Sequence, residues 1–193
     1  KKALKWFKLS ADKNDSYAKN NLGHLYIIGL GVDIDYKEAM KWFKLSAEHN
    51  FYAAQCNIGY MYKNGLGVDK DYQEAFKWYK LSADNNGRSA LYNMGYLYFN
   101  GFGVDKDYKE ALKWFKLSAD QNNDSAQNQI GYMYEKGLGV DKDYNEALKW
   151  FKLSANQNNC YAQNNIGYMY INGLGVDKDY KEALKWFKLS ADQ

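Results

Sequence analysis

Two patterns of apolar residues follow one another along the chain, and they recur together with a period of 36 residues. Both have the spacing of one face of an α-helix, because apolar residues return after three or four positions. The first stripe consists of Ala18, Leu22, Leu25 and Tyr26. The second consists of Tyr36, Ala39, Met40, Phe43 and Ala47, with Trp42 beside it. Each period therefore predicts two amphipathic helices, and the whole chain is predicted to be all-α.

Turn and capping residues separate the two helices of each period. Gly29 follows the first stripe and suits the left-handed residue just past a helix C-terminus. Asp35 then stands three residues before Glu38, which is a helix-start signal of the capping-box type. The same pair recurs as Asp71/Glu74, Asp107/Glu110, Asp143/Glu146 and Asp179/Glu182. The small residues Gly23 and Ala39 are expected to let neighbouring helices approach closely.

Tryptophans mark the period, and they stand at Trp6, Trp42, Trp78, Trp114, Trp150 and Trp186. No insertion breaks the phase, and a single helix pair cannot cover its own apolar faces, so the pairs are expected to stack. The sequence thus predicts one array over 1–193, in which a lone second helix at 1–14 precedes five helix pairs. The five pairs span 15–50, 51–86, 87–122, 123–158 and 159–193. We expect both ends to be cut from a longer array.

The composition is that of a folded globular protein, since 46% of the 193 residues are hydrophobic and 25% are charged. The 26 basic and 23 acidic residues give a net charge of +3, which is too balanced to indicate nucleic-acid binding by itself. No apolar run approaches the roughly 20 residues of a membrane helix, so no membrane insertion is expected. Cys56 and Cys160 lie almost three repeats apart and are predicted to be free thiols, which favours a reducing, cytoplasmic compartment.

One pattern runs through every repeat, A-x-x-x-L-G-x-L-Y-x-x-G-x-G-V-x-x-D-x-x-x-A-x-x-W-x-x-x-x-A, which first extends from Ala18 to Ala47. It closely resembles the Sel-one-like repeats, a subfamily of the tetratricopeptide repeats. The resemblance implies a right-handed α/α superhelical solenoid of tetratricopeptide-like helix–turn–helix repeats. It also implies a scaffold or adaptor for protein–protein interaction and not an enzyme. Some secreted bacterial members join each repeat by two cysteines, and this chain lacks those pairs.

The sequence of the repeat gives little indication of a motif for catalysis, metal binding or cofactor binding. The G-x-G of each turn follows no predicted strand and precedes no G-K-[ST], so it does not indicate a phosphate loop. The segment Asp69-Lys70-Asp71 lacks the glycine and glutamate spacing of a calcium-binding loop. The only histidines, His24 and His49, have no obvious Ser or Cys nucleophile beside them and are expected on the surface. We expect no enzymatic activity, no metal and no cofactor.

Lysines form a stripe on the second helix beside its buried face, as at Lys37, Lys41 and Lys44. One interpretation is a solvated face on which the lysine stems cover apolar surface. The other is a non-specific track for the phosphate backbone of RNA or of another polyanion. We favour the solvated face, keep polyanion binding as the alternative function, and regard nucleic acid as the less favoured partner.

A second stripe on the first helix is polar and lies about 100° from the buried one. Its amides offer a donor and an acceptor to any extended peptide, and its tyrosines add flat apolar area at low entropic cost. By resemblance to the tetratricopeptide repeats, this stripe faces the concave side and binds a peptide or protein segment. The alternative is that the amides bond only their neighbours or solvent. The predicted site residues are Asn21, Asn57, Asn93, Gln129 and Asn165 with Tyr60, Tyr92, Tyr96, Tyr132 and Tyr168.

Apolar side chains at the two ends of the array are expected to lack intramolecular cover. They are Ala3, Leu4 and Phe7 at one end and Tyr180, Ala183, Leu184 and Phe187 at the other. Exposed apolar patches of roughly a few hundred Å² tend to recruit contacts, so we expect weak end-to-end self-association or fraying of the terminal helices.

Overall fold

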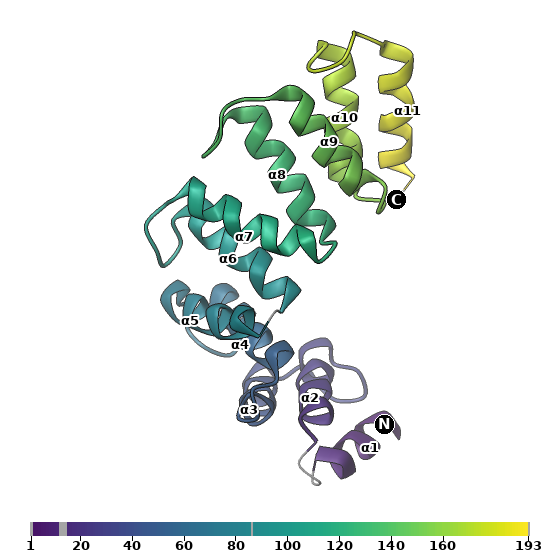
Figure 1. The fold of residues 1–193 in the computed structure, drawn as a ribbon. Helices are drawn as coiled ribbons and strands as arrows, with labels where there is room; N and C mark the ends of the chain where they lie inside the picture. Colours follow the sequence, from purple (N-terminus) through teal and green to yellow (C-terminus); the bar gives the residue numbers. More distant parts are fainter. Residues whose placement is uncertain (1, 12–14, 86, 193) are drawn as a thin grey trace. The chain divides into compact units, whose positions relative to one another are not determined.

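The computed structural model describes residues 2–11, 15–85 and 87–192, and within these ranges it contains eleven α-helices and no strand (Figure 1). The helices are α1 (Lys2–Ala11), α2 (Ser16–Ile28), α3 (Tyr36–Ala47), α4 (Tyr52–Asn64), α5 (Tyr72–Asp84), α6 (Arg88–Asn100), α7 (Tyr108–Asp120), α8 (Asp124–Lys136), α9 (Tyr144–Ala155), α10 (Cys160–Asn172) and α11 (Tyr180–Ala191). Pairs such as α2 with α3 and α10 with α11 pack against each other. The predicted all-α fold of repeated helix pairs is therefore confirmed.

The first complete pair, α2 and α3, begins and ends largely as the local sequence predicts. Gly29 lies just past α2 with a φ of 70°, a left-handed conformation that glycine adopts readily. Asp35 precedes α3, and its Oδ1 accepts a hydrogen bond from the backbone N–H of Glu38 at 2.9 Å. The reciprocal half of the predicted capping box is wrong, because the N–H of Asp35 donates to the backbone oxygen of Tyr26 at 3.0 Å. The Glu38 carboxylate instead pairs with Lys41 at 2.8 Å.

A glycine lets the two helices of a pair approach closely. A Cβ atom added at Gly23 of α2 would lie 2.5 Å from Cε1 of Phe43 on α3, and Phe43 is fully buried. Two carbon atoms cannot approach to that distance in a packed interior, so the pair needs glycine at this position. Equivalent glycines meet equivalent rings at Gly59/Tyr79, Gly131/Phe151 and Gly167/Phe187. The predicted role of Gly23 is confirmed.

A serine that the apolar pattern overlooks also lies in the core. Ser46 is fully buried, and its hydroxyl donates a hydrogen bond to the backbone oxygen of Ser16 at 2.6 Å. This bond satisfies a buried hydroxyl and ties the end of α3 to the start of α2. The same bond joins Ser82 to Tyr52, Ser154 to Asp124, and Ser190 to Cys160. The buried face therefore includes a polar residue. The apolar pattern could not indicate this, because the backbone oxygen that accepts from the serine comes close only when the two helices pack against each other.

Within each unit, successive pairs share apolar side chains, so the core continues from one repeat into the next. Phe43 of α3 lies in one buried cluster with Ile58 of α4. The turns support this stacking, because a Cβ atom at Gly67 would lie 2.6 Å from the backbone carbonyl carbon of Tyr36. Only glycine allows the turn of one repeat to approach the preceding second helix so closely.

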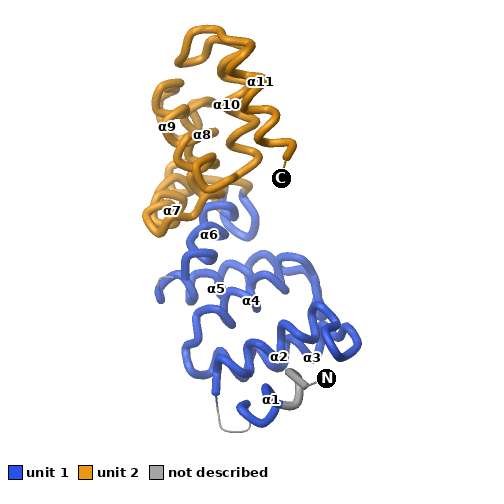
Figure 2. The backbone as a smooth tube through the Cα atoms, turned by 90° about the vertical axis from the view of Figure 1, so that its right-hand side faces the viewer, with its two compact units in different colours: residues 1–97, 101–105 blue, residues 98–100, 106–193 orange. Residues whose placement is uncertain are grey.

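Two compact units make up the chain (Figure 2). One comprises residues 1–97 and 101–105, and the other comprises residues 98–100 and 106–193. Within the first unit, buried clusters form around Leu22 and Phe43, and within the second a cluster forms around Phe151. Each unit therefore has its own apolar core.

The helix α11 is less buried than the equivalent helices before it. Leu184 is 54% exposed, whereas Leu148 at the same position of α9 is 7% exposed. Among the residues of α11, Ala183 is the buried one. The expectation of uncovered ends also concerns Ala3 and Leu4. Their side chains lie outside the described part of the chain. The expected self-association stays a prediction.

Candidate functional site

The predicted polar stripe lies on the first helices of both units. In the first unit, α2, α4 and α6 carry Asn21, Asn57, Asn93, Tyr60, Tyr92 and Tyr96. In the second unit, α8 and α10 carry Gln129, Asn165, Tyr132 and Tyr168. Tyr60 and Tyr168 are exposed, and the other residues of the stripe are half-buried. The stripe is thus accessible to a ligand in each unit.

Two of the predicted amides bond the preceding first helix. Asn57 Nδ2 donates to Asn20 Oδ1 at 2.9 Å, and Asn165 Nδ2 donates to Asn128 Oδ1 at 3.0 Å. Part of each amide therefore joins successive helices, in line with the alternative interpretation of the stripe. Among the described residues, nothing donates to the Oδ1 atom of Asn57 or of Asn165. Each amide thus keeps an acceptor that a ligand N–H group can reach.

His24 takes part in the same network as a neutral imidazole. Its Nε2 atom lies 3.1 Å from Asn57 Nδ2, and an amide NH₂ group can only donate, so Nε2 is the acceptor. Partial burial lowers the pKa of His24 below its ordinary value, which agrees with a neutral ring. The ring also meets Phe43 edge to face, with 5.3 Å between the ring centroids. His24 therefore contacts the core and the amide stripe at once.

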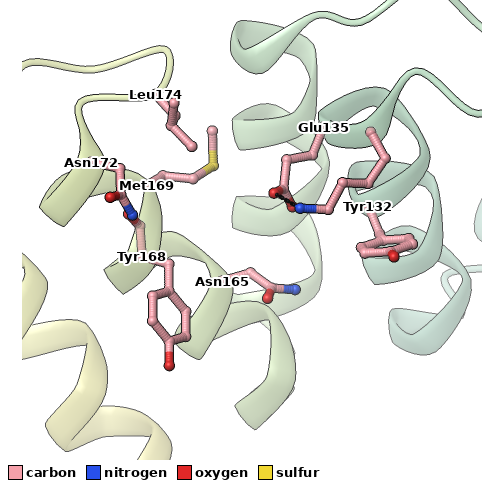
Figure 3. Close-up of a pocket in the computed structure, with 8 residues that line it drawn as sticks. Tyr132, Glu135, Asn165, Tyr168, Met169, Asn172 and Leu174 are labelled. Carbon is pink, nitrogen blue, oxygen red and sulfur yellow. Dashed lines mark hydrogen bonds and ion pairs between the residues drawn. The ribbon is translucent and has the colours of Figure 1, made fainter.

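A groove of about 310 Å³ lies in the second unit between side chains of α8 and α10 (Figure 3). It brings together three of the predicted site residues, Tyr132, Asn165 and Tyr168. The other lining residues are Glu135, Lys136, Met169, Asn172 and Leu174. Rings, an amide and a thioether together offer flat apolar area with hydrogen-bonding groups at its edges, as ligand sites commonly do.

The charged groups of this groove neutralise each other. Lys136 Nζ lies 2.5 Å from Glu135 Oε1, and the pair is drawn with a dashed line in Figure 3. The same ammonium lies 5.7 Å from the centroid of the Tyr132 ring. The hydrogen bond to the carboxylate raises the pKa of Lys136, so the lysine stays charged and paired. The groove therefore presents little net charge to a ligand.

A second groove of about 330 Å³ in the same unit shares Asn165 with the first. Its lining consists of Asn128, Cys160, Tyr161, Asn164, Asn165 and Ser190. Asn165, whose amide donates a hydrogen bond to Asn128, is therefore the residue that the two grooves share. This places Asn165 at the centre of the candidate site in the second unit.

The predicted site residues leave out five lining residues of the first groove, and two of these, Lys136 and Asn172, continue the polar stripe by one more helical turn. The other three were not indicated by the stripe. Met169 belongs to the buried face, Leu174 follows α10 in the turn, and Glu135 lies outside the predicted stripe. A signal for Glu135 was available, because its position varies among repeats that are otherwise nearly identical. The equivalent residues are Ile27, Lys63, Phe99 and Ile171.

Lysines of the second helices pair with glutamates of the same helix. Lys41 lies 2.8 Å from Glu38, and Lys149 lies 2.9 Å from Glu146. The same pairing recurs at Lys77/Glu74, Lys113/Glu110 and Lys185/Glu182. These exposed pairs offset part of the positive charge on the stripe, so their geometry gives no support to polyanion binding.

The other chemically notable groups form no site of their own. Cys56 and Cys160 are free thiols, as predicted, and burial raises the pKa of Cys56 to about 11, so that this thiol is protonated at neutral pH. In the described part of the chain, no group of three or more His, Cys, Asp and Glu side chains is arranged to hold a metal ion. Within the same ranges, every helix is too short or too polar to cross a membrane.

A family model described as Sel1 repeat matches the chain in six segments. The matched residues are 1–15, 16–51, 53–87, 88–123, 124–159 and 160–193. No curated protein matches the chain.

Solved structures are similar to the chain as well. A protective antigen of uropathogenic Escherichia coli with an SLR fold is 38% identical, with a TM-score of 0.91 over 98% of this chain and 40% of the antigen. A Sel1 repeat protein from Oxalobacter formigenes is 37% identical, with a TM-score of 0.88 over 93% of this chain and 71% of that protein. The cysteine-rich protein B of Helicobacter pylori, 22% identical with a TM-score of 0.52 over 65% of this chain and 90% of that protein, shares the fold alone. The chain thus spans less than half of the antigen's length.

Proposed function

The chain belongs to the Sel1 repeat family, and from this we propose that its first helices bind an extended segment of a partner protein. Proteins of this family are generally non-catalytic scaffolds for protein interactions. The proposal adds a site to that general role. The site is the stripe of amides and tyrosines on the first helices, and in the second unit it is centred on Asn165.

The position of Asn165 carries the proposal. It lines both grooves, its Oδ1 atom accepts no hydrogen bond from the described residues, and the exposed ring of Tyr168 lines the first groove with it. An extended peptide presents N–H and C=O groups along its whole length, so one amide acceptor can bind many sequences. Tyrosine rings add contact area for the peptide side chains. Asn57 and Tyr60 provide the same two groups in the first unit.

Peptide binding can be tested with two variants of the groove. Random dodecapeptides displayed on phage are selected on the immobilised 193-residue chain, and one selected peptide is labelled for fluorescence anisotropy. Asn165→Ala and Tyr168→Ala are each expected to raise the Kd roughly two- to tenfold, because one hydrogen bond or one aromatic contact contributes about 0.5–1.5 kcal/mol.

Asn145→Ala is the matched control for this experiment. Asn145 is an exposed asparagine on α9 that lines neither groove, so its removal is expected to leave the Kd unchanged. Circular dichroism of each variant checks that the helices persist. A Kd that rises as much in Asn145→Ala as in Asn165→Ala, or that stays constant in both groove variants, would contradict the proposed site.

A further inference from the structure

Lys63 of α4 is a half-buried cation in contact with two tyrosine rings and one amide oxygen of the first unit. Its Nζ atom donates to Asn93 Oδ1 at 2.9 Å and lies 5.1 Å from the Tyr96 ring centroid and 5.7 Å from that of Tyr60. Asn93 is held in this orientation because its Nδ2 atom donates to the backbone oxygen of Ser89 at 2.8 Å. Three predicted residues of the polar stripe therefore converge on one ammonium group.

The charge of Lys63 has no carboxylate partner among the described residues, whereas Lys136 is paired with Glu135. Burial lowers the pKa of Lys63, which means that its surroundings stabilise the ammonium less well than water does. The two rings and the amide oxygen therefore do not fully replace the lost hydration. An ammonium has three N–H donors, and a single one is used within the described chain.

The equivalent position of α8, in the second unit, carries the opposite charge. Lys63 and Glu135 occupy the same place in the repeat, and Tyr60 and Tyr132 precede them by one turn. Glu135 is followed by Lys136, which neutralises it, whereas Lys63 is followed by the uncharged Asn64. At equivalent places of similar repeats, α4 thus presents a cation without a carboxylate partner, whereas α8 presents a neutral ion pair.

We propose that Lys63 binds the side-chain carboxylate of an aspartate or glutamate in the extended partner segment. The inference rests on the proposed function and specifies the partner further, as a segment with an acidic residue where it passes α4. A carboxylate would complete the donors of Lys63 with a charge-assisted hydrogen bond, while its methylene groups pack on Tyr60 and Tyr96. A phosphate group is the less suitable ligand, because the contacts of Lys63 include neither an arginine fork nor a helix N-terminus.

Two pentapeptides test the inference directly on the 193-residue chain. The probes are acetyl-Ala-Ala-Glu-Ala-Ala-amide and its counterpart with glutamine in place of glutamate. NMR signals of the Lys63 ammonium and of the Tyr60 and Tyr96 rings report on the site, and backbone amides of α4 report on peptide binding in general. We expect the glutamate peptide to bind with a Kd roughly five- to twentyfold lower than that of the glutamine peptide. Lys63→Gln should abolish this difference, and the control Lys116→Gln, which removes the same charge from an exposed position of α7 that lines neither groove, should preserve it.

Every other result of the titration contradicts the inference about Lys63, the proposed peptide binding, or both. Equal affinity of the two peptides, or a glutamate preference that survives Lys63→Gln, overturns the inference and leaves the proposed peptide binding intact. If neither peptide shifts the α4 amides, the inference and the proposed function of this helix both fail. If sodium phosphate displaces the glutamate peptide at a lower concentration than sodium acetate does, the site is one for phosphate. Should Lys63→Gln fail to fold, the comparison of both peptides on the unaltered chain still decides.

Discussion

Asn57 donates its amide hydrogens to Asn20 Oδ1 and His24 Nε2, and it still offers its own Oδ1 to solvent. At the scale of single residues, the polar stripe thus joins neighbouring helices and also presents a surface. This combination follows from the chemistry of an amide, which has both donors and an acceptor. A substitution in the stripe is therefore expected to affect stability as well as binding, and each binding test needs a folding control.

We expect His24 to make the stability of the first unit depend on pH. Burial holds its pKa in the folded state below the ordinary value of 6.5, so the unfolded chain binds the proton more readily. The stabilisation is present above the unfolded pKa and is lost as the pH falls through the folded one. The urea midpoint of the wild-type chain is therefore expected to fall further between pH 7.5 and pH 5.5 than that of His24→Tyr.

The choice of tyrosine keeps the packing of this position. Tyr168 at the equivalent place meets Phe187 edge to face at 5.4 Å, nearly as His24 meets Phe43 at 5.3 Å. His49→Gln serves as the control and should retain the pH dependence of the wild-type chain. An identical loss of midpoint in His24→Tyr and in the wild type would show that His24 does not carry this effect.

At the scale of helices, equivalent side chains differ in burial although the helices that carry them share the same sequence segment. The segment EALKWFKLSA is identical in α9 and α11, yet Leu148 is 7% exposed and Leu184 is 54% exposed. The difference arises because side chains of α10 cover Leu148 in one buried cluster. The local sequence therefore determines that the segment is helical, whereas packing against the next helix determines how many of its side chains are buried.

Leu148→Ala and Leu184→Ala form a matched pair that tests this difference. Removing a buried leucine leaves a cavity, so Leu148→Ala is expected to lower the free energy of unfolding by about 2–4 kcal/mol. Leu184→Ala removes a largely exposed side chain and should cost less than about 1 kcal/mol. Urea unfolding followed by circular dichroism measures both values. Equal losses of the free energy of unfolding would mean that Leu184 is buried in solution. The expected self-association of the chain would have this effect.

At the scale of the whole molecule, successive helix pairs within each unit stabilise one another. The cluster around Phe43 contains residues of α3 and α4, and the cluster around Phe151 contains residues of α9 and α10. In such an array the stability is approximately a sum of repeat terms and nearest-neighbour terms. Disturbance of one repeat should therefore spread over a short range.

Hydrogen exchange of Leu148→Ala measures that range. Amide protons of α8, α9 and α10 are expected to exchange at least about tenfold faster than in the wild-type chain, because the local free energy of opening falls there. Amides of α2 and α3 should keep their wild-type rates. Uniform acceleration over all helices would instead indicate one cooperative unit without separable repeats.

Much of the candidate site was accessible from the sequence, and the remainder was not. The stripe containing Asn57, Tyr60 and Asn165 follows from the helical period, which fixes the face on which a residue lies. The period does not tell which neighbour an amide meets, so the sequence does not predict the bond from Asn165 to Asn128. The groove beside Glu135 was missed, because a groove depends on the spacing between two helices.

The sequence by itself determined the helices, the glycine turns and the buried columns, because each of these depends on residues within one or two helical turns of one another. The recurrence of these signals every 36 residues showed that the helices come in pairs. Gly29 and Asp35 act through the backbone that immediately surrounds them. The tertiary structure alone decided the partners of Ser46, of Asn57 and of Lys63. Those partners stand 30 to 37 residues away along the chain, and a hydrogen bond forms only when packing brings two atoms to within about 3 Å.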